Sequence, residues 1–253
     1  MRNITVGIDI GTQSTRVIVG EYGSADNAPN IIGMGVAESR GVRHGYINNK
    51  AEAQKCLGKA LLEAERGSKI KIRRAFAAVG GLSLDSIMGT GLAVISKADD
   101  EVTDLDVKRA VAESEKSLGT LPNRRILHAV PVRWKLDGKE IWGRPIGMKG
   151  LKLEVKTLFV TCLEQHLNDM VEVIENSGVE VIDVVASPIA ASLVTLTKRQ
   201  KTAGSVLVNI GAETVSMVVF ENDVPIFLHI FPIGGADITN DIALGLKIPI
   251  EEA

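Results

Sequence analysis

Few aromatic residues, few cysteines and almost no net charge mark this sequence. Its 253 residues include two Trp, two Tyr, five Phe and two Cys, and its formal net charge at pH 7 is -2. Because no basic excess is present, the sequence lacks the electrostatic signature of a nucleic-acid-binding protein. Cys56 and Cys162 lie far apart without metal-ligand spacing, so we expect reduced thiols that pack in the interior of a cytoplasmic protein.

Long apolar runs are also absent from the sequence. No stretch reaches the roughly 20 apolar residues that a helix needs to cross a bilayer. A predicted strand begins at Ile4, so we expect no signal peptide. Hydrophobic residues make up 45% and charged residues 24% of the chain, which is typical of a globular protein with one or two domains.

What the sequence does contain is one motif written twice. Residues 6–14 read VGIDIGTQS and residues 206–214 read VLVNIGAET, with Val, Ile and Gly in register and a hydroxyl three residues after each glycine. Each copy continues into a second apolar stretch, which predicts a strand, a glycine turn and another strand. Two such hairpins that face one cleft can present two sets of backbone N–H groups to one polyphosphate. The repeat therefore predicts nucleotide binding.

The first turn carries residue types that suit a phosphate. Gly11 lets a phosphate approach the backbone without a Cβ in the way, and Thr12 and Ser14 add hydroxyl donors. Asp9 ends the preceding strand, where its carboxylate could hold Mg²⁺ through a bound water. An ordinary hairpin would also explain one glycine turn, but the second copy favours phosphate binding.

The second turn is chemically weaker than the first. Asn209 occupies the position of Asp9, and an amide cannot act as a base. Ala212 and Glu213 follow Gly211, so the loop is less open. Glu213 is either an anion close to the phosphates or a solvent-facing turn residue, and its backbone N–H could donate in both cases.

A glycine pair follows the second hairpin. Gly234 and Gly235 precede a predicted helix that continues through Ile238 and Ile242. Backbone N–H groups at such a helix start could bind the same anion. A plain tight turn that caps the helix is the alternative, and the position of the pair favours ligand binding.

The rest of the chain alternates predicted strands and helices. Strands are predicted over residues 31–39, 74–80, 179–185 and 224–231, and helices over residues 49–67, 163–176 and 188–196. The middle differs: it has paired strand segments broken at residues 89–91, a helix capped by Thr103 and Asp106, and a long strand over residues 151–163. A further strand contains Pro131, which makes it either an edge strand or a strand with a bulge. This pattern predicts an α/β protein with a small α+β unit at residues 82–160.

These motifs together resemble the actin, Hsp70 and sugar-kinase superfamily, in which two glycine-turn hairpins clamp the phosphates of ATP. Within it the chain is similar to the FtsA family of bacterial cell-division proteins. The second resemblance rests on residues 7–12, 79–81, 126–131, 145–148 and 234–243. It implies an actin-like (ribonuclease H-like) α/β fold with an inserted small α+β subdomain and an incomplete second half.

The resemblance also implies how the chain divides. Residues 1–81 and 161–201 would form subdomain 1A, residues 82–160 the inserted, SHS2-like subdomain 1C, and residues 202–253 part of subdomain 2A. The chain would then be truncated at its C-terminus. The subdomain that binds FtsZ and the amphipathic helix that binds the membrane would both lie in the missing part.

Carried over to this sequence, the resemblance assigns the phosphate loops and the cofactors ATP and Mg²⁺. The first loop would be Gly11, Thr12, Gln13 and Ser14, and the second Gly211, Ala212, Glu213 and Thr214, with Asp9 as the magnesium-side acid and candidate catalytic residue. Asn209 departs from the acid that the family carries there, and Ser187 lies where Hsp70-like members carry a glutamate. We therefore expect at most a very weak ATPase.

Three functions are compatible with this resemblance. The first is an ATP-binding scaffold of bacterial cell division that forms filaments, links the FtsZ ring to the cytoplasmic face of the inner membrane at the division septum, and recruits later division proteins through its inserted subdomain. The second is an actin-like scaffold for pilus assembly. The third is a sugar or acid kinase, which would need a catalytic base, and Asp9 is the one candidate. The segment 128–131 favours the division protein by resemblance.

Overall fold

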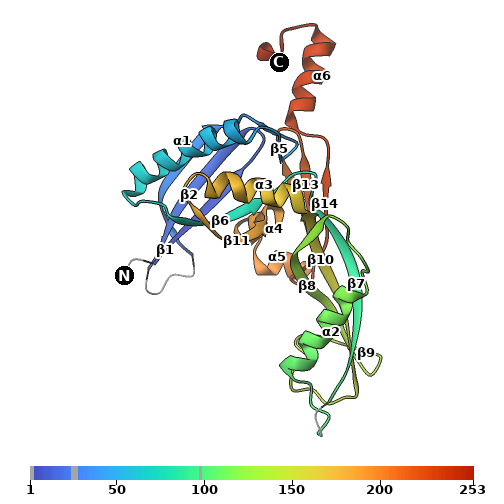
Figure 1. The fold of residues 1–253 in the computed structure, drawn as a ribbon. Helices are drawn as coiled ribbons and strands as arrows, with labels where there is room; N and C mark the ends of the chain where they lie inside the picture. The colour runs from blue at the N-terminus through green and yellow to red at the C-terminus, as the bar shows by residue number, and fades with distance from the viewer. Residues whose placement is uncertain (1–2, 24–27, 97–98) are drawn as a thin grey trace.

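The computed structural model describes residues 3–23, 28–96 and 99–253 and arranges them around three larger sheets (Figure 1). The first sheet has five strands in the order β11-β6-β1-β2-β3, in which β1, β2 and β3 are antiparallel while β6 and β11 run parallel to β1. These strands are β1 (Asn3–Ile10), β2 (Ser14–Tyr22), β3 (Asn30–Glu38), β6 (Arg74–Val79) and β11 (Glu180–Ala186). The predicted hairpin around Gly11 is thus confirmed.

Helices cover the first sheet. Helix α1 (Lys50–Ser68) packs on β2 and β3 and also contacts α3 (Glu164–Glu175). The side chain of Asn49 accepts a hydrogen bond from the N–H of Glu52 at 3.2 Å, so the predicted N-cap of α1 is confirmed. The short hairpin of β4 (Val42–Arg43) and β5 (Tyr46–Ile47) precedes α1.

A four-stranded antiparallel sheet follows β6 in the chain, in the order β7-β10-β8-β9. Its strands are β7 (Asp85–Val94), β8 (Arg124–Leu136), β9 (Lys139–Ile141) and β10 (Lys152–Leu163), and α2 (Asp104–Lys116) packs on one face. We call β7, α2, β8, β9 and β10 the four-stranded unit. It projects from one end of the molecule in Figure 1.

Two details of the four-stranded unit test the sequence reading. The pairing of β8 with β10 shifts its register beside Pro131, which confirms the bulge, one of the two alternatives that this proline predicts. The predicted break at residues 89–91 is wrong, because β7 runs through it unbroken. Gly91 serves close packing instead, since a Cβ there would lie 2.0 Å from the carbonyl oxygen of Ala110 on α2.

The third sheet is antiparallel and has three strands in the order β12-β13-β14, namely β12 (Ser205–Ile210), β13 (Val215–Glu221) and β14 (Val224–Phe231). Helices α4 (Ser187–Thr195) and α5 (Lys198–Ala203) connect it to β11, and α6 (Gly235–Leu246) with the 3-10 turn η1 (Ile250–Glu252) follows β14. Helix α6 projects beyond the sheets at the end opposite the four-stranded unit (Figure 1).

One large apolar core joins these parts. Buried residues of the first sheet, of α1 and α3, and of β13 and β14 form a single cluster that also includes Leu158 and Val160 of β10. A smaller cluster under α2 belongs to the four-stranded unit alone. Across residues 3–23, 28–96 and 99–253, none of the helices combines the length and the apolar character needed to cross a bilayer.

Candidate functional site

The two glycine turns lie across one cavity of about 740 Å³. Its lining includes Asp9, Gly11, Thr12, Gln13 and Ser14 from the first hairpin and Asn209, Gly211, Ala212, Glu213 and Thr214 from the second. Residues two hundred positions apart therefore face the same space. This is the geometry that the sequence repeat predicts.

Both turns are built in the same way. The N–H of Gly11 donates to the carbonyl oxygen of Ser14 at 3.1 Å, and the N–H of Gly211 donates to that of Thr214 at 2.8 Å. A Cβ on Gly11 would lie 3.1 Å from that Ser14 oxygen, and one on Gly211 would lie 3.0 Å from its Thr214 counterpart. Neither glycine has a positive φ. The glycines are thus needed because the backbone closes tightly on itself.

Asp9 and Asn209 occupy matching places at the ends of β1 and β12. Asp9 lies opposite Arg16 in the pairing of β1 with β2, and Asn209 lies opposite Ser216 in that of β12 with β13. All four residues line the cavity. Burial raises the pKa of Asp9 above its ordinary value, and the positive charge of Arg16 opposes that rise. Asp9 is therefore a desolvated carboxyl beside one cation.

Glu213 lines the cavity with a partly exposed side chain, and its carboxylate is hydrogen-bonded rather than free. Its carboxylate oxygen Oε2 accepts the N–H of His44 at 2.5 Å, and its carbonyl oxygen lies 3.2 Å from Nδ1 of His44. The next N–H in the loop, that of Gly45, donates to Oγ1 of Thr12 at 3.1 Å. The loop between β4 and β5 thus contacts both glycine turns.

The glycine pair before α6 has two different environments. The N–H of Gly235 donates to the carbonyl oxygen of Gly211, and the N–H of Ala236 donates to that of Ala212, each at 2.8 Å. Gly235, Ala236 and Thr239 line the cavity, whereas Gly234 lies outside the lining and its N–H donates to Asp237 at 2.7 Å. The start of α6 is therefore docked on the second turn, and it reaches the cavity through Gly235.

Sequence reasoning missed Gly45, which borders the cavity. Gly80, Gly81 and Ser187 also border it; the family resemblance drew attention to these three without assigning them to the site. Gly45 and Gly81 cross closely, since a Cβ on Gly45 would lie 2.3 Å from the Cα of Gly81. The one local signal was the glycine content of these loops, because their position at the cavity depends on contacts between distant segments.

Magnesium is the metal whose chemistry fits these residues. Among the residues that the structure describes, no group of three or more His, Cys, Asp or Glu side chains could hold a metal ion. Mg²⁺ keeps several waters and is commonly bound by one or two carboxylates together with substrate phosphates. Asp9 provides one such carboxylate on the cavity wall.

Family models match two parts of the chain. A model described as "SHS2 domain inserted in FTSA" matches residues 81–161, and one described as "Cell division protein FtsA" matches residues 206–253. Curated proteins named "Cell division protein FtsA" match nearly the whole chain. The relative from Bacillus subtilis is 32% identical over 98% of this chain and 56% of its own length, and that from Escherichia coli K12 is 29% identical over 100% and 59%. The chain thus spans less than two thirds of these relatives.

Solved structures share the fold at lower identity. A "PilM-PilN type IV pilus biogenesis complex" superposes with a TM-score of 0.66 at 16% identity, covering 98% of this chain and 67% of the other. The ethanolamine utilization protein EutJ from Carboxydothermus hydrogenoformans superposes with a TM-score of 0.56 at 15% identity, covering 98% and 59%. At these identities the likeness concerns the fold alone.

Proposed function

This chain belongs to the FtsA family of cell-division proteins, and we propose that it binds ATP with Mg²⁺ between its two glycine turns as part of a division scaffold. Its α/β fold is the actin-like one with an inserted SHS2 domain, as the sequence predicts. The observation that carries the proposal is the shared cavity, in which two turns of the same construction face each other.

The donors of the two turns suit a polyphosphate. Thr12 and Ser14 place hydroxyl groups at the first turn, and Thr214 places one at the second. The oxygen of Thr12 accepts the N–H of Gly45, so its own hydrogen stays available to a phosphate oxygen. The carboxylate of Glu213 accepts the N–H of His44, so one of its oxygens is held by the protein backbone and is not available to the ligand or its metal ion.

Asp9 would hold Mg²⁺ through water, and the ion would neutralise charge on the phosphates. Burial raises the pKa of Asp9, the Arg16 guanidinium beside it opposes that rise, and a bound cation would also favour the carboxylate. The sequence also suggests that Gly234 and Gly235 bind the ligand, and this stays a prediction. Gly235 is the better placed of the two, because it lines the cavity.

Hydrolysis in this cavity would be very weak. Among the described lining residues, carboxylates come from Asp9 and Glu213, and Glu213 is held by His44. Asn209 and Ser187 offer an amide and a hydroxyl where a base would be needed. We therefore propose a nucleotide-binding scaffold with at most slow turnover. The same shortage of bases disfavours a sugar or acid kinase.

We extend the proposal to the longer proteins that this chain matches. Residues 1–81 with 161–201, residues 82–160 and residues 202–253 would be subdomains 1A, 1C and part of 2A. Such a protein would self-associate into filaments and bind FtsZ through a subdomain beyond this chain. It would bind the cytoplasmic face of the inner membrane through a C-terminal helix beyond this chain, and its 1C subdomain would contact later division proteins. The names of the curated relatives favour this role over pilus assembly.

Calorimetric titration with ATP and Mg²⁺ tests the proposal. We expect one site per chain, weakened at least tenfold by Asp9→Ala and unchanged by Asp241→Asn, a control at an exposed acid on α6. Phosphate release should stay close to that of Asp9→Ala. The absence of binding to the unmodified protein would overturn the proposal, and rapid phosphate release would overturn its scaffold character.

A further inference from the structure

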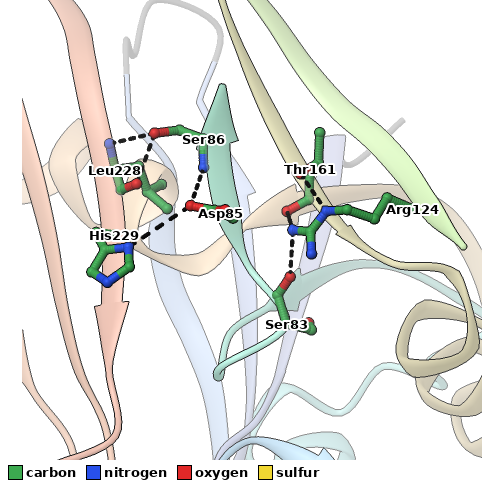
Figure 2. A network of polar contacts seen from close by, with 7 residues as sticks. All are labelled: Ser83, Asp85, Ser86, Arg124, Thr161, Leu228 and His229. Atoms are coloured by element: carbon green, nitrogen blue, oxygen red, sulfur yellow. Dashed lines mark hydrogen bonds and ion pairs between the residues drawn. The ribbon is translucent and has the colours of Figure 1, made fainter. Parts of the chain in front are cut away.

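The four-stranded unit shares the apolar core with the third sheet, and at the start of β7 one serine hydroxyl adds a polar contact between them. Oγ of Ser86, at the start of β7, donates to the carbonyl oxygen of Leu228 at 2.7 Å and accepts the N–H of Leu228 at 3.0 Å (Figure 2). Because β14 is the outer strand of its sheet, this hydroxyl replaces the neighbouring strand that Leu228 lacks on that side. Beside it, Nδ1 of His229 lies 3.7 Å from Oδ1 of Asp85.

The same unit, which also shares the apolar core with the first sheet, makes a polar contact with that sheet through a histidine. Nε2 of His128, on β8, accepts the N–H of Ala186 at 2.9 Å. An amide N–H can only donate, so Nε2 carries no proton in this contact. Burial lowers the pKa of His128, which favours the neutral ring that the contact needs, although Asp183 opposes this. Ala186 is fully buried and is the N-cap residue of α4.

Both contacts lie directly behind the nucleotide cavity. Ser187, which follows Ala186, lines the cavity on the side of the first sheet. Ile230, two residues after Leu228 on β14, lines it on the side of the third sheet, together with Ser216, its partner on β13. The four-stranded unit thus contacts both walls of the cavity, at Ala186 on the side of the first sheet and at Leu228 on the side of the third sheet.

Hydrogen bonds of Arg124 connect the strands that carry Ser86 and His128. Arg124, at the start of β8, donates through Nη2 to the carbonyl oxygen of Ser83 at 2.9 Å and through Nε to Oγ1 of Thr161 at 2.9 Å (Figure 2). These bonds join the segment that enters β7, the start of β8 and the end of β10. Ser86 and His128 therefore belong to strands that are connected to each other near the cavity.

From this arrangement we propose that the four-stranded unit straddles the cavity and fixes the separation of its walls, with Ser86 and His128 as positioning residues for the nucleotide. The proposal rests on the proposed function for its ligand. We call this connection between the two walls the strut. It fixes their separation only while Ser86 and His128 both keep their contacts, so the loss of either contact has the full effect on nucleotide affinity. Conversely, whatever moves this unit changes nucleotide affinity, and nucleotide binding changes the position of the unit.

A double-mutant cycle on ATP affinity tests the strut. We expect Ser86→Ala, which removes two hydrogen bonds, and His128→Leu, which removes one, each to weaken binding about fivefold. The double variant should bind no more weakly than either single variant. Ser86→Thr and His128→Gln, which keep the hydroxyl and an acceptor, should restore most of the affinity. Additive losses, near 25-fold in the double variant, or unchanged affinities would overturn the proposal.

A matched control separates the strut from general damage to the unit. Ser117→Ala removes hydrogen bonds to Thr90 and Ser114, all within the four-stranded unit. It should leave ATP affinity unchanged. An equal loss of affinity in this variant would contradict a role confined to the two contacts.

Amide hydrogen exchange without ligand gives an independent readout. In His128→Leu the N–H of Leu228 should exchange faster, and in Ser86→Ala the N–H of Ala186 should do so, each measured against amides of α1 in the same variant. If the unmodified protein binds no ATP, the proposed function fails while this experiment still decides the strut. Exchange that changes only at the mutated end would overturn it.

Discussion

Asp9 shows at the scale of one residue how a binding role opposes stability. Burial raises its pKa against the opposing charge of Arg16, so the folded protein without ligand keeps this carboxyl protonated to a higher pH than the unfolded chain does. Between the ordinary pKa and the raised one, the native state binds more protons than the unfolded chain. The free energy of unfolding therefore falls as pH rises through this window, and the lost stability stays lost at neutral pH.

Asp9→Asn should accordingly stabilise the ligand-free protein at pH 7, by about 1 kcal/mol, while it weakens binding of ATP with Mg²⁺. The amide keeps the size of the carboxyl but carries no charge to desolvate. Urea unfolding at pH 7 with and without nucleotide measures both effects. A variant that is less stable than the parent without ligand would show that Arg16 outweighs the burial of Asp9.

Cys162, unlike Asp9, has a role in packing alone. Its side chain is fully buried, and burial raises its pKa to about 11, so the thiolate that reacts with electrophiles is scarce at neutral pH. We expect no labelling of Cys162 by iodoacetamide in the native protein and full labelling in urea. Mass spectrometry of the labelled peptide distinguishes it from Cys56, and rapid native labelling would contradict the packing role predicted from sequence.

At the scale of elements, glycine acts through backbone approach on β7. A Cβ on Gly91 would meet the carbonyl oxygen of Ala110 at 2.0 Å and the N of Ser114 at 2.3 Å, and neither backbone atom can move without moving α2. Gly91→Ala should destabilise the protein by about 3 kcal/mol. Thermal unfolding measures the change.

Gly58→Ala is the matched comparison for that substitution. Gly58 lies within α1 and its Cβ would have no heavy atom within 4 Å. Alanine there should stabilise the helix by up to about 1 kcal/mol. Equal effects at the two positions would show that α2 does not pack on β7 as described.

Strand β7 illustrates which parts of the fold can be predicted from the sequence. Strands β1, β2 and β10 were predictable because their apolar residues alternate or run together. The break at residues 89–91 was mispredicted because glycine in a strand signals a turn locally, whereas here it admits a helix from another part of the chain. Local pattern identifies an element, but only packing reveals why a glycine is there.

The candidate site divides in the same way. The paired turns were predictable because the sequence repeats matching residues at both. The contact of His44 with Glu213 was not, because it joins positions 169 residues apart and His44 lies outside the repeat. Its partners become neighbours only once the first and third sheets have met.

At the scale of the whole molecule, two histidines lie where separate parts join. His128 joins the four-stranded unit to the start of α4, and His166 of α3 shares a short hydrogen bond with Ser83 and packs against the ring of Tyr46 at 5.0 Å between centroids. Burial lowers the pKa of both, against weaker opposing effects from Asp183 on His128 and from Gly45 and Asp169 on His166. Both rings are therefore neutral in the folded protein at neutral pH.

Acid should consequently loosen the assembled molecule before it affects most carboxyl groups. Below the ordinary histidine pKa of about 6.5 the unfolded chain binds protons, whereas the two native rings, whose pKa values are lower, stay neutral. The free energy of unfolding therefore falls as pH falls towards the lowered pKa values, by up to about 1.4 kcal/mol per pH unit for each histidine. Asp9 acts in the opposite sense, because its raised pKa makes stability fall as pH rises. Urea unfolding between pH 5 and 8 should show this loss in the parent, and much less of it in a protein carrying His128→Gln and His166→Gln. An equal pH dependence in the two proteins would mean that other groups control the acid response.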